Sequence, residues 1–267
     1  MKRLVLLIVI GIITLLGVND SLAYVIDGKL DDWGVTPGLF GNSDWEPNSG
    51  VYWTEEDQNT DYLNPGYGGQ LYDAEAIYFD YNQGHAYIAI VTGFPKSGRT
   101  SGSNKFYPGD IAIDFGRNGV YEYGIKTSKY EPLYGMSGDG GDVYRVTSWG
   151  TAYEGIHEGV WGYKSDPTVI KEGNKIGSTY LEYIKGNYAG NYKWHYIIEA
   201  RLPLDLFGND PVAPEWYSPF RIHWTMTCGN DAIDLDVPPV PEPATIFLLC
   251  SGLLSLLGII GTRRKVS

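Results

Sequence analysis

Short apolar segments separated by turn residues run along most of this chain, and they restrict its fold more than any other feature. Turn residues recur about every ten positions, and no long segment has helical periodicity. The 22 Tyr and 8 Trp residues also favour strands. We therefore expect an all-β fold, a single two-sheet antiparallel β-sandwich of jelly-roll type. The strand candidates are residues 76–81, 85–92, 110–115, 120–126, 142–149, 194–202 and 220–228.

The clearest hairpin lies between residues 110 and 126. With a three-residue loop at 117–119, one face of the hairpin is entirely apolar and Ile111 lies opposite Ile125. A two-residue Asn-Gly turn would instead set Ile111 against Lys126 and mix the two faces. Because register follows the apolar pattern, we expect the three-residue loop.

On the other face of this hairpin the expected register sets Asp114 opposite Glu122. Like charges in that position are destabilising unless something compensates them. A calcium ion would do so, because it takes six to eight oxygen ligands, and Asn118 in the adjacent turn offers another. The alternatives are that water screens the pair on a solvated face, or that Asp110 with Lys126 dominates the local field.

Two stretches rich in glycine and polar residues are expected to form loops. Residues 42–69 form the longer one, and loops of that length are usually functional or mobile. The shorter one, residues 138–142, carries Asp139 and Asp142, which we expect to form a second, independent calcium site.

The N-terminus has the composition of a secretory signal peptide. A basic dipeptide precedes a short apolar stretch, and small residues then occupy the two positions that a signal peptidase inspects. We expect residues 1–23 to be removed by cleavage between Ala23 and Tyr24. An uncleaved N-terminal anchor is the alternative.

The C-terminus combines a proline-rich motif, an apolar run and a basic cluster. The residues that mark it are Pro241, Glu242, Pro243, Arg263, Arg264 and Lys265. The apolar run between them is just long enough to span a membrane, and the positive-inside rule keeps the basic cluster in the cytoplasm. The expected organisation after the signal peptide is a β-sandwich domain (24–236), a linker (237–243), a transmembrane helix (244–262) and a cytoplasmic tail (263–267).

This tail resembles the sorting tail of PEP-CTERM proteins, which has the same three parts in the same order. The resemblance implies that an exosortase removes the tail after a signal peptidase has removed the leader. The protein would then be anchored only transiently in the inner membrane before it reaches the cell surface or the medium. It also implies a Gram-negative bacterium that makes exopolysaccharide. A plain C-terminal anchor is the alternative.

The part of the chain between the two targeting segments is strongly acidic, with 15 basic and 30 acidic residues. Such a surface repels nucleic acid and anionic lipid, so we expect no nucleic-acid partner and membrane contact only through the terminal segments. It suits divalent cations or neutral sugars. This part holds one cysteine, Cys228, so no intrachain disulfide can form there, and we expect a buried, inert thiol.

Three segments suggest a second resemblance: Ile-Asp-Gly-Lys-Leu-Asp-Asp-Trp at 26–33, a strand pair at 72–90, and a strand followed by a short helix at 194–207. They are similar to carbohydrate-binding module family 9 and DOMON-like sandwiches. The resemblance implies that calcium is sometimes bound and that sugar lies between aromatic side chains near loops. The aromatic residues expected there are Trp53, Trp149, Trp161 and Tyr163.

For each of these four residues, burial in packing is the alternative to sugar binding. Trp33 and Pro203 are expected to serve packing and the end of a strand. Trp194 and Trp224 lie inside strand candidates, and we expect them to face the core.

Haem and nucleotide are not expected, and calcium is the only cofactor we expect. Some DOMON relatives bind haem through a Met and a His, but His223 and Met226 are three apart on one strand candidate and so point to opposite faces. Catalytic motifs are also missing: the chain has no G-x-S-x-G and no H-E-x-x-H.

The leading hypothesis is a non-enzymatic surface protein that binds glycan, such as exopolysaccharide, or serves as a structural and adhesive module. The alternative is a secreted glycan-active hydrolase that uses a pair of carboxylates. A more remote alternative is an ice-binding or other surface-adhesion protein. Ice-binding faces usually carry repeated Thr-x-Thr rows, and here only Thr225-Met226-Thr227 has that form.

Overall fold

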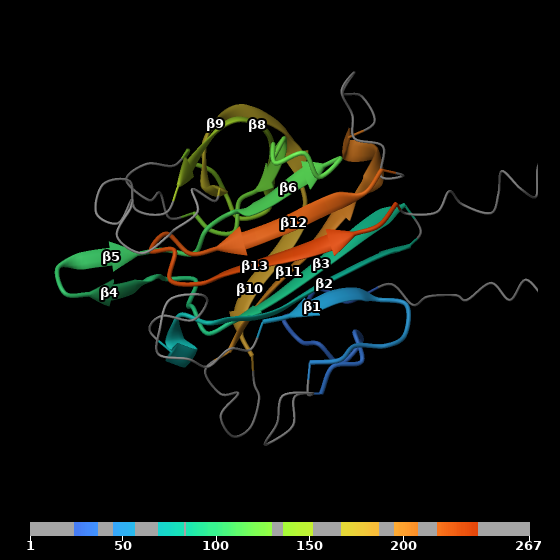
Figure 1. Cartoon of the computed structure of the whole chain (residues 1–267), viewed down its shortest axis with the longest axis horizontal. Coiled ribbons are helices and arrows are strands. Elements are labelled where there is room, and N and C mark those ends of the chain that lie inside the picture. The colour runs from blue at the N-terminus through green and yellow to red at the C-terminus, as the bar shows by residue number, and fades with distance from the viewer. Residues whose placement is uncertain are drawn as a thin grey trace, which may run out of the picture.

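Two antiparallel sheets and one projecting hairpin make up the computed structural model (Figure 1). It describes residues 24–36, 45–56, 69–82, 84–129, 136–151, 167–186, 195–207 and 218–239. The first sheet has the order β1 (Tyr52–Glu55), β2 (Ala74–Asn82), β3 (His85–Thr92), β11 (Tyr196–Pro203), β10 (Tyr180–Lys185). The second has the order β13 (Ala232–Val237), β12 (Phe220–Thr225), β6 (Ile111–Phe115), β7 (Tyr123–Ile125), β8 (Asp142–Thr151), β9 (Pro167–Ser178).

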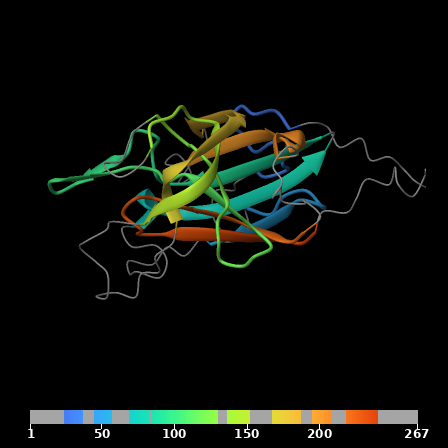
Figure 2. The ribbon, with the colours of Figure 1, turned by 90° about the horizontal axis from the view of Figure 1, so that it is seen from above.

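Short elements complete the fold. The hairpin of β4 (Arg99–Ser101) and β5 (Asn104–Phe106) projects at the left of Figure 1. The described residues also include two 3-10 turns, η1 (Gly69–Leu71) and η3 (Leu204–Phe207), the second directly after β11. The pair β8–β9 curves strongly in Figures 1 and 2, and its register shifts at four places. Such irregularities bend a strand pair, which explains the curve.

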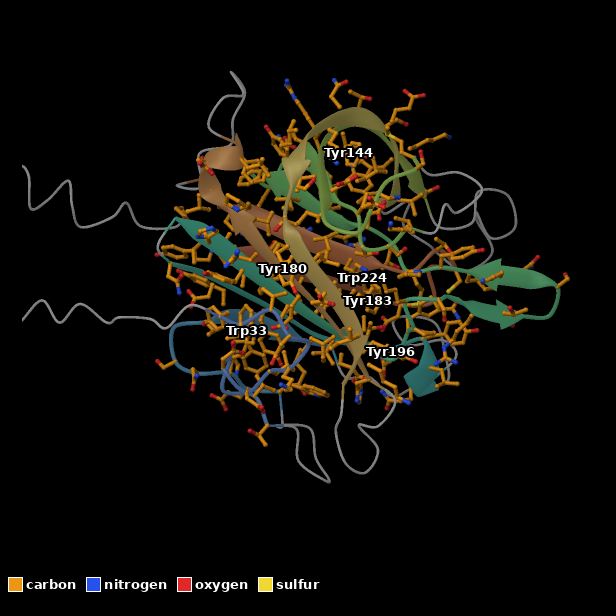
Figure 3. All side chains as sticks on the ribbon, turned by 180° about the vertical axis from the view of Figure 1, so that it is seen from behind. Trp33, Tyr144, Tyr180, Tyr183, Tyr196 and Trp224 are labelled. Carbon is orange, nitrogen blue, oxygen red and sulfur yellow. The ribbon has the colours of Figure 1, made fainter. Side chains whose placement is uncertain are left out.

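The main core lies between the two sheets. Alternate residues of facing strands fill it, including Ile77 and Phe79 from β2, Ile113 from β6 and Trp224 from β12, all fully buried. Figure 3 shows Trp224 and Tyr183 in this interior. Each such side chain contributes about 1.5–3 kcal/mol by leaving water. The all-β prediction is confirmed, and the facing sheets agree with a β-sandwich.

A second core covers the outer face of the first sheet. We call residues 24–36 and 45–51 the N-terminal cover. Its buried side chains, such as Leu30, Trp33 and Trp45, pack on the outward side of β2, β3 and β11. Tyr24 stacks on Trp33 with ring centroids 4.0 Å apart, and its hydroxyl donates to Asp80 at 2.6 Å. Both faces of this sheet are therefore buried.

The expected hairpin register is confirmed, because Ile111 pairs with Ile125 and the shared face lies in the main core. The second strand is shorter than expected, since β7 begins only at Tyr123. The backbone pairing of β6 with β7 ends at Ile113 and Tyr123. Beyond it, the N–H of Phe115 donates to the Glu122 carboxylate at 3.0 Å. Gly119 has φ +84°, a left-handed conformation that glycine adopts readily.

The other strand predictions had mixed success. Trp224 faces the core and Cys228 is buried, as expected, and η3 is the short helix expected after the strand of residue 202. Sequence reasoning missed β1, β9, β10, β13 and the β4–β5 hairpin. From residue 171 on, β9 is mostly polar and partly or fully exposed, so the strand lacks the alternation that would reveal it.

Several predictions lie outside the described residues. These are the signal peptide with Ala23, the sorting residues Pro241, Glu242, Pro243, Arg263, Arg264 and Lys265, the helix of residues 244–262, and the aromatic residues Trp161, Tyr163 and Trp194. Within the part of the chain that the structure describes, no helix has the length and apolar character needed to cross a membrane.

Candidate functional site

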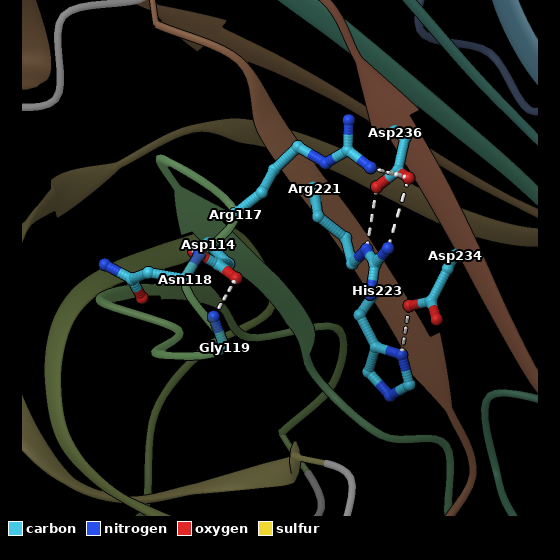
Figure 4. A network of polar contacts seen from close by, with 8 residues as sticks. All are labelled: Asp114, Arg117, Asn118, Gly119, Arg221, His223, Asp234 and Asp236. Carbon is cyan, nitrogen blue, oxygen red and sulfur yellow. Dashed lines mark hydrogen bonds and ion pairs between the residues drawn. The ribbon is translucent and has the colours of Figure 1, made fainter.

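The hairpin expected to bind calcium satisfies its carboxylates with its own backbone, and Figure 4 shows the bond between Asp114 and Gly119. Asp114 is buried and accepts from the N–H groups of Asn118 at 3.1 Å and Gly119 at 2.8 Å. Glu122 accepts from Phe115, and burial, with the charge of Asp114, raises the pKa of Glu122 above its usual range. The turn amides therefore supply compensation for which calcium was invoked. A calcium ion at Asp114, Asn118 and Glu122 stays a prediction.

Beside that turn, ion pairs join the loop to the outer face of the second sheet (Figure 4). Arg221 donates to Asp236 through Nε at 2.7 Å and Nη2 at 3.1 Å, and Arg117 donates to the same carboxylate. His223 is buried and pairs with Asp234 at 2.7 Å through Nδ1. The hydrogen bonds from Arg221 hold the pKa of Asp236 below its usual range. Exposed pairs of this kind contribute little stability, so they orient the turn more than they hold the fold.

At the second predicted calcium site, in the glycine-rich loop, each aspartate forms an ion pair with a lysine. Asp139 pairs with Lys129 at 2.8 Å, and Asp142 pairs with Lys175 at 2.6 Å and accepts from Ser178 at 2.9 Å. Burial raises the pKa of Asp142, but the bonds from Lys175, Asp139 and Ser178 together bring it below its usual value. Protein cations already balance these carboxylates, and calcium at Asp139 and Asp142 stays a prediction.

The two described aromatic candidates for glycan binding lie on different sheets. Trp53 of β1 is partly buried and stacks on Tyr78 with centroids 6.5 Å apart. Trp149 of β8 donates through Nε1 to the carbonyl of Tyr121 at 2.8 Å, and its ring lies over Gly124. A Cβ on Gly124 would come within 2.6 Å of the Trp149 ring. Both rings are engaged in packing, and the structure does not bring them together as a platform.

A different set of carboxylates converges at one end of the sandwich. Glu56 follows β1, Asp73 precedes β2 and Asp231 precedes β13, and the nearest oxygens of the three lie within 4.8 Å of one another. Asp231 accepts from the N–H groups of Ala74 at 2.5 Å and Ala232 at 2.8 Å. The cluster thus links the first sheet to the second.

Electrostatics make this cluster unlike the hairpin. Burial, together with the charges of Glu56 and Asp73, raises the pKa of Asp231 to about 10, although the N–H of Ala74 opposes the shift. Carboxylates this close cannot all stay ionised without a cation or a proton between them. Carboxylate oxygens are the ligands that Ca²⁺ prefers, so the cluster could hold such an ion.

Sequence reasoning missed this cluster because its members are far apart in the chain. Glu56 lay in the expected loop of residues 42–69, and neither β1 nor β13 was predicted. One signal was present: each of the three acids directly flanks a strand end. Without the strand order, that signal does not say which strand ends meet.

Another buried acid, Glu199 of β11, binds the sequence segment 26–33 at the start of the sandwich domain. Its carboxylate accepts from the indole N–H of Trp33 at 2.9 Å and from the backbone N–H groups of Gly28 at 2.6 Å and Asp27 at 3.0 Å. Burial raises the pKa of Glu199 to about 7 against these three donors. Trp33 is fully buried, so the expectation that it serves packing is confirmed.

Comparison with known proteins gives one match, at the C-terminus. The family model described as PEP-CTERM protein-sorting motif matches residues 239–265, which confirms the resemblance of the tail. The motif supports an exported surface protein that an exosortase sorts. No curated protein and no solved structure matches the chain. The resemblance of residues 24–236 to carbohydrate-binding module family 9 and DOMON-like domains therefore stays a prediction.

Proposed function

We propose that this chain is an exopolysaccharide-associated surface protein whose β-sandwich binds glycan and catalyses no reaction. The observation that carries the proposal is the sorting motif at residues 239–265, which begins just after β13 ends at Val237. The sandwich is thus the folded part that sorting delivers. PEP-CTERM tails imply a cell that makes exopolysaccharide, so glycan is the polymer that such a module meets.

The chemistry of the buried groups favours binding over catalysis. Burial raises the pKa of the Cys228 thiol to about 12, so the thiolate needed for nucleophilic attack is scarce at neutral pH. Asp114 and Glu199 are committed to backbone N–H groups inside the fold. These acids support the structure and are poorly placed to serve as the carboxylate pair of a hydrolase.

Calcium belongs to the same proposal, at a different place from the two sites expected from sequence. The cluster of Glu56, Asp73 and Asp231 offers oxygen ligands from both sheets, and its Asp231 holds a proton that a cation would replace. An ion there would join the ends of β1, β2 and β13 and stiffen the sandwich that carries the glycan site.

Delivery and binding can be tested separately. Mass spectrometry of surface material should find chains that begin at Tyr24 and lack the apolar segment after Pro243. Intact C-termini there would contradict processing. For binding, the full chain in detergent micelles should retain glycans from the producing cell's polysaccharide on an array without releasing reducing sugar. Steady release of reducing ends would favour the hydrolase alternative.

A further inference from the structure

One stretch of this acidic protein carries only positive charge. Residues 93–109 contain Lys96, Arg99 and Lys105 and no Asp or Glu, although acidic residues outnumber basic ones two to one in the region between the targeting segments. The stretch leads from β3 through the projecting β4–β5 hairpin to the start of β6. On a protein with this excess of acidic residues, such a stretch is a place where a polyanion can make contact.

A groove lies beside the beginning of this stretch. Its volume is about 540 Å³, which is within the range of small-ligand sites. The residues that line it are Lys96, Ser97, Lys129, Asp139, Gly140 and Leu181. It therefore combines two ammonium groups, one carboxylate, one hydroxyl and one apolar side chain from four separate parts of the chain.

The turn that presents Lys96 is held firmly. The N–H of Gly98 donates to the carbonyl of Pro95 at 2.9 Å, which puts Lys96 and Ser97 at the two central positions of the turn. Gly98 has φ +76°, and a Cβ there would lie 2.2 Å from a backbone oxygen of Phe106. Just before the turn, the buried Phe94 carbonyl accepts from the hydroxyl of Tyr183 at 2.7 Å. The backbone that carries Lys96 is thus fixed before any ligand binds.

The opposite wall is also a bonded turn. The N–H of Asp142 donates to the carbonyl of Asp139 at 3.0 Å, and the Asp139 carboxylate pairs with Lys129 at 2.8 Å. Lys96, by contrast, forms no ion pair with any other residue in the ranges that the structure describes. Among the described residues, the groove thus holds one ammonium group with no carboxylate partner.

We propose that this groove binds a carboxylate-bearing sugar unit, a uronate, of an acidic polysaccharide. The Lys96 ammonium group takes the carboxylate, Leu181 packs against the apolar face of the sugar ring, and Ser97 and Asp139 bond its hydroxyls. This inference rests on the proposed glycan-binding function and names the class of glycan. It differs from the aromatic platform expected from sequence, and none of the residues expected to bind glycan lines the groove.

The test uses the full chain in detergent micelles, with polygalacturonate as the probe and neutral dextran as the comparison. EDTA is present throughout, because calcium could bridge a polyuronate to any acidic surface. We expect binding to polygalacturonate that weakens as NaCl rises from about 50 to about 300 mM, since salt screens exposed charges. Lys96→Gln should weaken it about three-fold and Lys96→Glu about ten-fold, in line with one exposed charge pair and its reversal.

Lys29→Gln is the matched control, because it removes the same charge from an exposed lysine of the N-terminal cover, 61% exposed and paired with Asp27. It should bind like the parent chain. Equal loss in Lys29→Gln and Lys96→Gln would overturn the inference, because net charge alone would explain both. Binding to dextran without binding to polygalacturonate would overturn it and leave the proposed function standing. Binding to no glycan on the array or in solution would remove both.

Discussion

Glu199 and Asp231 are both buried acids, yet they lie in opposite surroundings. Around Glu199 are three N–H donors, from Trp33, Gly28 and Asp27. Around Asp231 are two backbone donors and two further carboxylates, those of Glu56 and Asp73. Burial raises the pKa of Glu199 to about 7, whereas burial and the neighbouring charges raise that of Asp231 to about 10.

The difference shows that burial does not by itself define a binding site. A buried carboxylate that N–H groups surround is a structural connection, and here it fastens the N-terminal cover to β11. A buried carboxylate that faces others keeps a proton or takes a cation. Only the second arrangement leaves a ligand to be found.

The largest effect expected from this comparison is at Glu199. Glu199→Ala leaves two buried N–H donors and one partly buried N–H donor without their acceptor. It should lower the free energy of unfolding by about 4 kcal/mol, since each orphaned buried donor costs about 1–3 kcal/mol. Urea unfolding of the full chain measures it. Glu199→Gln keeps one acceptor oxygen and should lose clearly less. Equal losses for the two variants would contradict this account, because the acceptor oxygen and the volume that Gln keeps would then contribute nothing.

Calcium should act on the other acid group, with the next largest effect. At a concentration one hundred times its dissociation constant, the ion should add about 2.7 kcal/mol to the free energy of unfolding. For a domain of this size that raises the melting temperature by roughly 5–10 °C. Scanning calorimetry with calcium and with EDTA measures the difference. Identical melting in the two conditions would reject an ion in the cluster.

Two variants test whether the calcium-dependent shift in melting temperature comes from the cluster of Glu56, Asp73 and Asp231. Glu56→Gln removes a ligand and should abolish the effect of calcium, while the EDTA melting temperature should stay level or rise slightly because a charge near Asp231 is gone. Glu172→Gln, in an exposed position of β9, removes the same charge elsewhere and should keep the full calcium effect. A calcium effect retained in Glu56→Gln would place the ion at another site, with the hairpin of Asp114 the first to examine.

The smallest effect, for one group and over one pH unit, is the pH dependence of stability measured in EDTA. The pKa of Glu199 is raised from its ordinary 4.5 to about 7, so between these values the folded chain holds a proton that the unfolded chain has released. Stability therefore falls as pH rises through this window, by at most about 1.4 kcal/mol per unit. For Asp231, with its pKa raised to about 10, the same sign applies and the fall continues above pH 7.

Glu199→Gln separates the two contributions. It should make the fall between about pH 5 and pH 7 less steep, because only Asp231 then contributes there, and leave the fall between about pH 7 and pH 10 unchanged. Urea titrations at a series of pH values measure both slopes. An unchanged slope below pH 7 would show that Glu199 does not hold its proton in the folded state.

Local patterns predicted the parts of the fold whose pairing is local. The register of β6 with β7 followed from one apolar face, and Ile111 lies opposite Ile125 as expected. Strands β9 and β10 escaped prediction because they are edge-side strands with polar, exposed stretches. The link between Asp27 and Glu199 crosses 172 positions, and no local pattern indicates such a pairing.

The sites were harder to predict for the same reason. The tail motif is contiguous, so it could be recognised, and residues 239–265 match its family. The cluster of Glu56, Asp73 and Asp231 exists only through the strand order. The predicted pair Asp114 and Glu122 was placed correctly on one hairpin. Its backbone N–H partners, Gly119 and Phe115, were not foreseen because the direction of an N–H group depends on the backbone angles of the turn.

The bond from the N-terminal cover to Glu199 also sets an order of events during export. Residues 24–36 leave the membrane first, but their acceptor lies on β11 and crosses almost last. Until then Trp33 and Leu30 can pack only against β2 and β3, and the first sheet lacks the strand that joins β3 to β10. Folding is thus completed only when the sorting tail is next to emerge, so the finished domain and the signal for its release reach the outer side together.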